Sequence, residues 1–167
     1  MDPNALSFNQ ASDQYRNDRP RYPQELYEVL GRHCVNHALA WDCGCGNGQV
    51  AIDLARHFGR VEASDINENQ IAHSFAHPRI RYTVQHSEST DFSTGSFDAL
   101  CVAQCLHWFD LELFFAEAKR VLKKNGVFAC WGYSFIHINP ALDAFFAEEL
   151  LHPIDPYWSE KNRLLHR

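Results

Sequence analysis

Three glycines at alternate positions form the segment with the clearest chemical meaning. They occur in the run Asp42-Cys-Gly44-Cys-Gly46-Asn-Gly48, between a short apolar stretch and a segment with helical periodicity. Glycine has no Cβ and tolerates positive φ, so a ligand can lie directly against the backbone where such a strand ends. A dinucleotide fingerprint would have its third glycine at position 49, which is glutamine, and the turn lacks the Lys-Ser/Thr pair of a P-loop. The loop therefore indicates a ligand site that does not cradle a pyrophosphate.

Two acids accompany this loop. Asp42 ends the strand before it, where a buried carboxylate is costly without a partner, and Asp65 ends the next predicted strand. In nucleotide-binding α/β domains, an acid at the end of the second strand commonly accepts hydrogen bonds from both ribose hydroxyls. Each feature alone has a structural explanation, since the loop could be a plain turn and Asp65 the N-cap of the following helix. The combination of loop, strand context and acid favours a ligand site.

His107 follows the fourth predicted strand, at the edge of the sheet where this architecture places ligands. An imidazole there could act as a general base, but its large apolar neighbours favour a residue that shapes the wall of the site. Cys43 and Cys45 supply too few ligands for a metal ion, so we interpret them as small filling residues and predict no metal.

Strand-like and helical segments alternate along the chain, as they do in folds built on a parallel sheet. Strands are predicted over residues 38–43, 61–65, 80–85, 97–104 and 127–133, and helices from Gln24, after Gly48, over 67–76, over 110–124 and after Pro140. Such alternation requires parallel pairing with right-handed crossovers, which predicts a doubly wound, mostly parallel α/β fold of five strands.

Two of the predicted helices carry specific expectations. In the first helix, an apolar stripe is expected at Leu26, Val29, Leu30 and Cys34. The helix over 110–124 is expected to end with Lys123 and Lys124, two cations near its carboxyl end, followed by a cap at Asn125-Gly126. The Phe114-Phe115 and Phe145-Phe146 pairs are expected to pack in the core or between helices.

The composition describes a folded, acidic domain. The chain has 167 residues, 46% of them hydrophobic, and a formal net charge of −6. This balance argues against a nucleic-acid binder, because phosphates require clustered cations. No apolar run reaches the length of a membrane span, and the N-terminus lacks the pattern of a signal peptide. Six cysteines without CxxC pairs indicate a reduced, cytoplasmic protein.

At three separated motifs the chain resembles the class I S-adenosylmethionine-dependent methyltransferases. Their first motif, D-x-G-x-G-x-G, matches Asp42 through Gly48. The stretch Y-x-x-x-R-P-x-Y-P and the signature A-Q-x-x-H-W-F-D, here residues 15–23 and 103–110, resemble the small-molecule branch that includes trans-aconitate methyltransferases. The resemblance implies a Rossmann-like methyltransferase fold, S-adenosylmethionine as cofactor with S-adenosylhomocysteine as product, and methylation of a small-molecule acceptor.

The resemblance also implies roles for single residues around the cofactor. The loop of Gly44, Gly46 and Gly48 would lie beneath the amino-acid end and the ribose. Asp42 would be near the ammonium group and Asp65 on the ribose hydroxyls. Ile66 and Ile71 would pack on the adenine, main-chain groups of His86 and Ser87 would contact its amine, and Gln104 would lie beside the methionine part. His86 stands where the family usually has an acid.

The resemblance divides the chain into three parts. Residues 1–22 form an arm in which Tyr15, Arg19, Arg21 and Tyr22 would fold over the site, 23–139 form the cofactor-binding domain, and 140–167 form a helical tail. Arginine pairs well with carboxylates, which suggests a carboxylic acid as acceptor, although surface arginines are also common.

The sequence also departs from the family in its number of strands. Family members usually have seven strands, whereas five are visible here, so the fifth strand is expected to be a sheet edge. The tail from Pro140 could cover this edge, but its prolines make it a poor strand and favour pairing of two copies there. The leading hypothesis is a methyltransferase. A catalytically silent member that binds cofactor or a partner is the alternative, and a nicotinamide dehydrogenase is disfavoured by Gln49.

Overall fold

The computed structural model describes residues 21–133 and 137–158. The chain divides into two compact units, residues 1–131 and 132–167, which are described separately. In the described ranges, no helix combines the length and the apolar character needed to cross a membrane.

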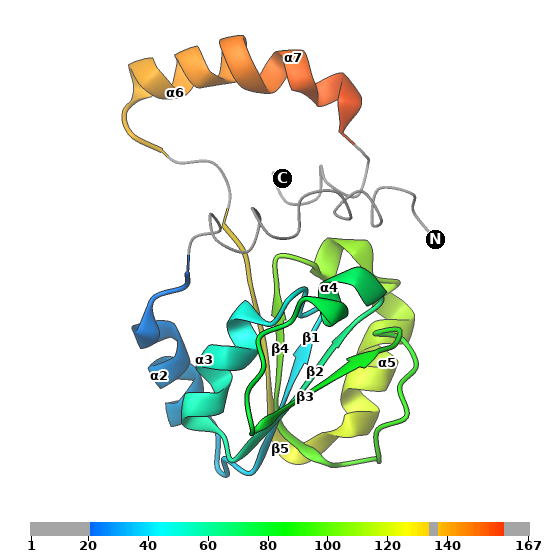
Figure 1. Cartoon of the computed structure of the whole chain (residues 1–167). Helices are drawn as coiled ribbons and strands as arrows, with labels where there is room; N and C mark the ends of the chain where they lie inside the picture. Colours follow the sequence, from blue (N-terminus) through cyan, green and yellow to red (C-terminus); the bar gives the residue numbers. More distant parts are fainter. Residues whose placement is uncertain (1–20, 134–136, 159–167) are drawn as a thin grey trace. The chain divides into compact units, whose positions relative to one another are not determined.

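A five-stranded parallel sheet forms the centre of the first unit. Its strands are β1 (Leu39–Cys43), β2 (Arg60–Asp65), β3 (Ile80–Val84), β4 (Phe97–Ala103) and β5 (Leu122–Trp131). They pair in the order β3-β2-β1-β4-β5 (Figure 1). The strand order changes direction between β1 and β4, because the chain adds β2 and β3 on one side of β1, and β4 and β5 on the other. The doubly wound α/β fold predicted from the alternation of elements is confirmed.

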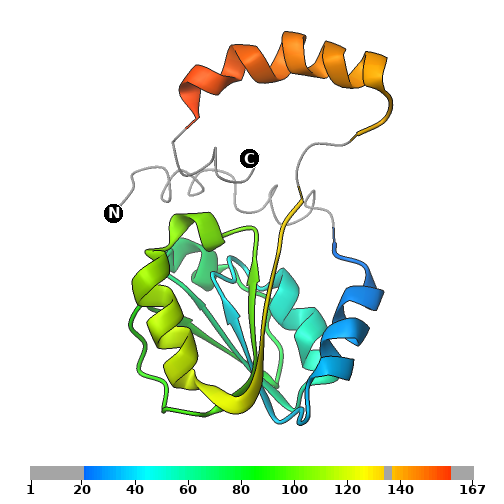
Figure 2. The ribbon, with the colours of Figure 1, turned by 180° about the vertical axis from the view of Figure 1, so that it is seen from behind.

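Helices cover both faces of this sheet. They are α2 (Gln24–His33), α3 (Gln49–His57), α4 (Glu68–Ala72), the 3₁₀ turn η2 (Leu106–Trp108) and α5 (Leu111–Val121). Figures 1 and 2 show α2 and α3 on one side of the sheet and α5 on the other. This arrangement follows from right-handed crossovers, because the chain first winds toward β3 and then returns to wind toward β5.

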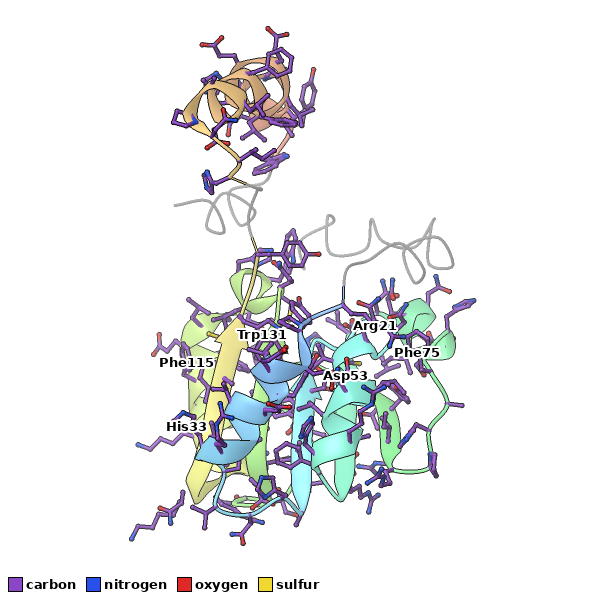
Figure 3. All side chains as sticks on the ribbon, turned by 90° about the vertical axis from the view of Figure 1, so that its left-hand side faces the viewer. Arg21, His33, Asp53, Phe75, Phe115 and Trp131 are labelled. Carbon is purple, nitrogen blue, oxygen red and sulfur yellow. The ribbon has the colours of Figure 1, made fainter. Side chains whose placement is uncertain are left out.

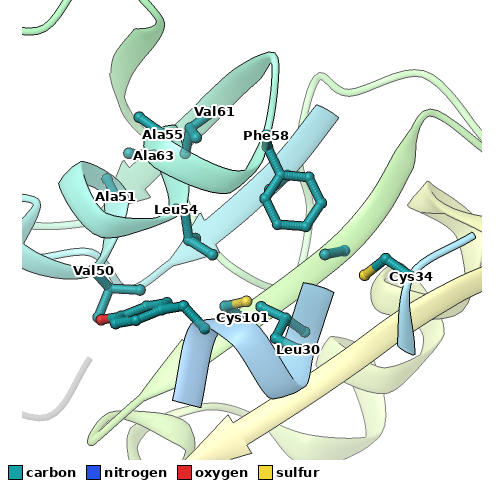
Figure 4. Close-up of a cluster of buried hydrophobic side chains, with 13 residues drawn as sticks. Leu30, Cys34, Val50, Ala51, Leu54, Ala55, Phe58, Val61, Ala63 and Cys101 are labelled. Atoms are coloured by element: carbon teal, nitrogen blue, oxygen red, sulfur yellow. The ribbon is translucent and has the colours of Figure 1, made fainter. Parts of the chain in front are cut away.

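The two faces of the sheet have separate apolar cores. Alternate strand residues point to opposite faces, so Ala40, Val61 and Ala63 pack under α2 and α3 (Figure 4). Trp41 and Cys43 pack on the other face with Phe114 of α5. The strands β1 and β4 therefore have apolar residues at consecutive positions, which explains why they read as short apolar runs in the sequence.

The buried face of α2 differs from the expected stripe. Tyr27 is fully buried, whereas Val29 is 42% exposed. Tyr27, Leu30 and Cys34 are spaced at i, i+3 and i+7 and therefore lie on one side of the helix. Burial, reinforced by the charges of Asp53 and Asp42, raises the pKa of Tyr27, so its hydroxyl stays neutral.

The boundary between α5 and β5 was predicted wrongly. The helix ends at Val121, and Lys123 and Lys124 belong to β5. Leu122 already pairs with Phe97 across the sheet. Regular pairing resumes with Val127 opposite Ala99, so residues 123–126 form an irregular part of β5, and a Cβ on Gly126 would come within 2.9 Å of the carbonyl oxygen of Phe97. Tertiary pairing outweighs the helix-ending pattern of cations and glycine here.

Asp98 explains why Lys123 is held in the strand. The Asp98 side chain is buried and accepts hydrogen bonds from the backbone N–H groups of Ala38 and Leu39, at 2.9 and 3.0 Å. Nζ of Lys123 lies 2.6 Å from its Oδ1. Burial alone would raise the pKa of Asp98, but the bonds from Lys123 and the backbone outweigh it and hold the pKa below its usual range.

We expect Asp98→Asn to lower the free energy of unfolding by about 2 kcal/mol at neutral pH, because charged hydrogen bonds are lost. A carboxyl with a lowered folded pKa stabilises the protein above its unfolded pKa, and that stability is lost as the pH falls through the folded pKa. Urea denaturation should therefore show a smaller difference between variant and wild type at acid pH. Asp91→Asn, at an exposed position, is the control; a constant difference at all pH values would contradict the assignment.

The second unit is helical from Pro140 to Tyr157. It contains α6 (Pro140–Phe146), the π-helical turn η3 (Ala147–Leu151), α7 (His152–Ile154) and the 3₁₀ turn η4 (Asp155–Tyr157). Asn139 caps α6 by accepting hydrogen bonds from the N–H groups of Ala141 and Leu142. Phe145 and Phe146, expected to pack in a core or between helices, are 59% and 43% exposed.

Candidate functional site

The glycine loop connects β1 to α3 with a strongly bent backbone. Gly44, Gly46 and Gly48 have φ values of 70°, 54° and 92°, a region that side chains with a Cβ rarely adopt. The N–H groups of Gly44 and Cys45 donate to the carbonyl oxygen of Ser64 on β2, at 2.8 and 2.9 Å. The loop is thus fastened to the neighbouring strand.

Two glycines of the loop also permit close contacts. A Cβ on Gly48 would overlap the ring of Tyr82 on β3, within 2.6 Å of Cε1. A Cβ on Gly44 would collide with Sγ of Cys105 and come within 3.3 Å of Phe109. Gly44 and Gly48 are therefore required by packing as well as by φ, whereas at Gly46 the positive φ alone favours glycine.

Asp65 lies beside the loop, as expected from the pairing of β1 with β2. The N–H of Gly46 donates to its Oδ2 at 2.8 Å, and the N–H of Asn67 donates to its Oδ1 at 2.8 Å. Burial raises the pKa of Asp65, and hydrogen bonds from the backbones of Asn67, Gly46 and Ile66 reduce that rise. Asp65 is not the N-cap of the next helix, because the side chain of Asn67 caps α4.

Gln104 marks the carboxyl end of β4. It has a φ of 59°, and it is the only residue other than glycine with a positive φ in the described ranges. Its N–H donates to the carbonyl oxygen of Trp131 on β5 at 3.0 Å. Such a conformation is sparsely populated and often accompanies functional sites. Asp42 is the last but one residue of β1, Asp65 ends β2 and Gln104 directly follows β4, so the three lie toward one edge of the sheet on adjacent strands.

The other predicted cofactor residues follow β2 and β3. Ile66 and Ile71 are half-buried, His86 is exposed and Ser87 is half-buried. Oε1 of Glu88 accepts a hydrogen bond from the N–H of Asp110 at 3.0 Å, which ties this segment to the start of α5.

His107 is a buried residue of the turn η2, with 8% of its surface exposed. Its ring lies against that of Trp108, with 4.7 Å between the ring centroids. The ring is therefore packed among large apolar neighbours, as the wall interpretation requires, and the role of His107 stays a prediction.

Only part of the arm that precedes α2 belongs to the described residues. Tyr15 and Arg19 lie outside them. Arg21 is exposed, and the ring of Tyr22 packs edge-on against Trp131 at 5.7 Å. Figure 3 labels Trp131 near the end of β5. Tyr22 therefore contacts the core of the first unit at the carboxyl end of the sheet.

Three polar residues around the loop have no motif that marks them in the sequence. Nδ2 of Asn47, Oε1 of Gln70 and Oη of Tyr82 are buried and have no hydrogen-bond partner among the described residues. Oε1 of Gln70 lies 3.8 Å from the position that a Cβ on Gly46 would take. Buried polar atoms without partners are rare and call for a ligand or a water molecule. The loop region thus offers donors and acceptors that fit a ligand rich in hydroxyl and charged groups.

The cysteines of the first unit are free thiols. Burial, reinforced by neighbouring acidic groups and thiols, raises the pKa of Cys43 and of Cys45 well above the usual value, so both stay protonated. Among the residues that the structure describes, no group of three His, Cys, Asp or Glu side chains is arranged to hold a metal ion.

Comparison with known proteins adds independent findings. The profile of the family described as "Methyltransferase domain" matches residues 41–130. A Dictyostelium discoideum protein named as a methyltransferase is 33% identical over 162 residues, which are 95% of this chain and 62% of that protein. A Saccharomyces cerevisiae protein named for S-adenosylmethionine-dependent methyl transfer is 28% identical, over 84% of this chain and 53% of its own.

A solved structure shows the same similarity in three dimensions. A protein of Anaeromyxobacter dehalogenans, described as a type II methyltransferase, superposes with a TM-score of 0.76 and 39% sequence identity. The superposition covers 86% of this chain and 61% of that one. The chain therefore spans roughly half to two thirds of the length of these similar proteins.

Proposed function

Because the chain belongs to the methyltransferase domain family, we propose that it transfers a methyl group from S-adenosylmethionine, the cofactor of this family, to a small molecule. The observation that carries the proposal is the Asp65 carboxylate, which is held 2.8 Å from the N–H of Gly46 where β1 and β2 end together. An acid in this place is suited to the hydroxyl pair of a ribose.

The residues present fit the cofactor. In the proposed arrangement, the glycine loop underlies the amino-acid end, Asp42 is near the ammonium group and Asp65 holds the ribose hydroxyls. The adenine packs on Ile66 and Ile71, with main-chain groups of His86 and Ser87 near its amine and Gln104 beside the methionine part. Bound S-adenosylmethionine supplies an electrophilic methyl group on a sulfonium. The unpartnered atoms of Asn47, Gln70 and Tyr82 support a polar ligand at this loop.

The protein's part in such a transfer is positioning. An in-line displacement requires that acceptor and methyl group be held together and that water be excluded. In this proposal His107, which is buried against Trp108, forms part of the wall of the site at the carboxyl edge of the sheet and helps to exclude water. A general base is needed only when the acceptor carries a proton at neutral pH, and a carboxylate does not.

We further propose that the acceptor is a carboxylic acid, as in the trans-aconitate-like branch that the sequence resembles. Arg19 and Arg21, two positions apart in the arm, supply the cations that would orient a carboxylate. Arg21 is exposed and directly precedes Tyr22, whose ring contacts Trp131.

We expect joint replacement of Arg19 and Arg21 by glutamine to raise the KM for an acidic acceptor by about tenfold and to leave the affinity for S-adenosylhomocysteine nearly unchanged. Steady-state kinetics with an acid and calorimetry with S-adenosylhomocysteine measure the two effects. An equal rise in KM for a neutral acceptor would rule out carboxylate recognition.

A screen of carboxylic acids, alcohols and amines as methyl acceptors tests the activity itself. Methyl transfer to any of them supports the proposal. Binding of S-adenosylhomocysteine without transfer to any acceptor would instead favour the catalytically silent alternative. The homodimer expected through the β5 edge is a separate proposal, which sedimentation velocity tests.

A further inference from the structure

A hollow of about 450 Å³ opens at the amino-terminal edge of the sheet, beside the segments that lead into β2 and β3. It is lined by Gly59, Arg60, Pro78, Arg79, Ile80 and Arg81. We propose that this hollow binds the phosphate group of a small phosphorylated ligand. Asp65 ends β2 and Arg60 begins it, so the hollow is roughly 17 Å from the glycine-loop site at about 3.3 Å per residue.

One buried acid orients two of the three arginines. Glu62, whose side chain is 7% exposed, lies opposite Arg81 in the pairing of β2 with β3. Its Oε2 accepts a hydrogen bond from Nε of Arg81 at 2.6 Å, and its Oε1 is 3.4 Å from a terminal nitrogen of Arg60. The carboxylate therefore engages both guanidinium groups and leaves most of their N–H donors available.

Arg79 is the arginine of the hollow that no acid in the described ranges compensates, since Glu62 pairs with Arg60 and Arg81. It is exposed, and its guanidinium has no hydrogen bond or ion pair within the described part of the chain. Three guanidinium groups and one carboxylate give the hollow a charge of about +2, which matches a phosphate monoester at neutral pH, with a charge of about −1.5 to −2. Planar guanidinium groups also bind phosphate oxygens in pairs.

The backbone N–H groups of Gly59, Arg60 and Arg79 at the hollow already donate hydrogen bonds within the protein, so a phosphate must be recognised by side chains. The N–H groups of Gly59 and Arg60 donate to the carbonyl oxygens of His37 and Ala38. The N–H of Arg79 donates to Nδ1 of His77. The hollow is thus unlike the glycine loop, where backbone groups form the site.

The fold keeps this region accessible. Glu62 lies on the face of β2 opposite to Val61 and Ala63, which pack under α3. The connection from β3 to β4, over residues 85–96, contains no helix that would cover this part of the sheet.

A small ligand fits better than a nucleic acid. A nucleic-acid surface requires a row of cations that neutralises successive phosphates, whereas these arginines surround one hollow on a chain with a net charge of −6. The local charge is therefore opposite in sign to that of the whole chain, which favours capture of a single anionic group.

NMR titration of the arginine Nε–Hε signals with inorganic phosphate and with glucose 6-phosphate tests the site. We expect the signals of Arg60, Arg79 and Arg81 to shift together with a millimolar or tighter Kd, and Arg79→Gln to weaken binding by about tenfold. Arg56→Gln is the matched control, because Arg56 is as exposed as Arg81 and pairs with Asp53 of the same helix, outside the hollow.

Three results would overturn the proposal. One is the absence of any shift at about 10 mM phosphate, and another is an equal loss of affinity in Arg56→Gln, which would indicate unspecific attraction. The third is tighter binding of a single-stranded RNA oligomer than of glucose 6-phosphate. Thermal unfolding of each variant confirms that the fold is kept, and S-adenosylhomocysteine affinity should be the same in Arg79→Gln as in the wild type.

Discussion

Replacing Gly48 with alanine is expected to lower the free energy of unfolding by about 3 kcal/mol, a value typical of overpacked buried sites. Two effects add. The φ of 92° is strained for any residue with a Cβ, and the new methyl group would overlap the ring of Tyr82, within 2.8 Å of Cζ. The ring of Tyr82 is half-buried, and because Oη, Cε1 and Cζ all lie too close to the new methyl group, the whole outer end of the ring must shift. Urea denaturation followed by circular dichroism measures the loss.

Gly95→Ala separates the two effects. Gly95 also has a positive φ, 63°, but a Cβ there would meet no atom within 4 Å. We therefore expect a loss of only about 1 kcal/mol, the backbone cost alone. In a Tyr82→Ala background, Gly48→Ala should cost no more than Gly95→Ala does. Equal losses for both glycine variants in the otherwise wild-type chain would show that packing against Tyr82 is unimportant.

The strands β1 and β4 were predictable because they are apolar on both faces. The segment predicted over 97–104 is β4, observed as Phe97–Ala103, since a strand buried between two cores has few polar residues. The end of α5 was not predictable in the same way. Lys123 follows an amphipathic pattern and precedes a glycine, and its place in β5 depends on the pairing of Leu122 with Phe97 and on its ion pair with Asp98, 25 residues earlier in the chain.

The same distinction applies to the candidate site. The proximity of Asp65 to the glycine loop follows from the pairing of β1 with β2, since parallel strands end at one edge of the sheet. The contacts of Asn47, Gln70 and Tyr82 depend on how α4 and β3 pack against the loop, and no local spacing in the sequence encodes that. Tyr82 could have been noticed only as a large polar aromatic residue in a strand of intermediate burial.

Asp65→Ala is expected to weaken the binding of S-adenosylhomocysteine by about 1–3 kcal/mol, or roughly tenfold to a hundredfold, because a charged acceptor is removed. The same change frees the N–H groups of Gly46 and Asn67, which donate to Asp65 in this structure. Calorimetry should therefore be accompanied by thermal unfolding. Asp91→Ala, at an exposed position in the connection from β3 to β4, should leave the affinity unchanged.

Asp65→Asn distinguishes a role of Asp65 in binding from a role in supporting the loop. Asparagine keeps one oxygen that can accept a hydrogen bond from the Gly46 N–H. Its neutral amide lacks the second, negatively charged oxygen that a carboxylate offers to the two ribose hydroxyls. Burial raises the pKa of Asp65, so the wild-type affinity should begin to fall at a higher pH than an exposed aspartate would give, as protonation removes the charge. The amide side chain of the variant does not titrate, and that part of the pH dependence should vanish. If the variant binds S-adenosylhomocysteine as tightly as the wild type, with the same pH profile, Asp65 supports the loop and does not hold the ribose.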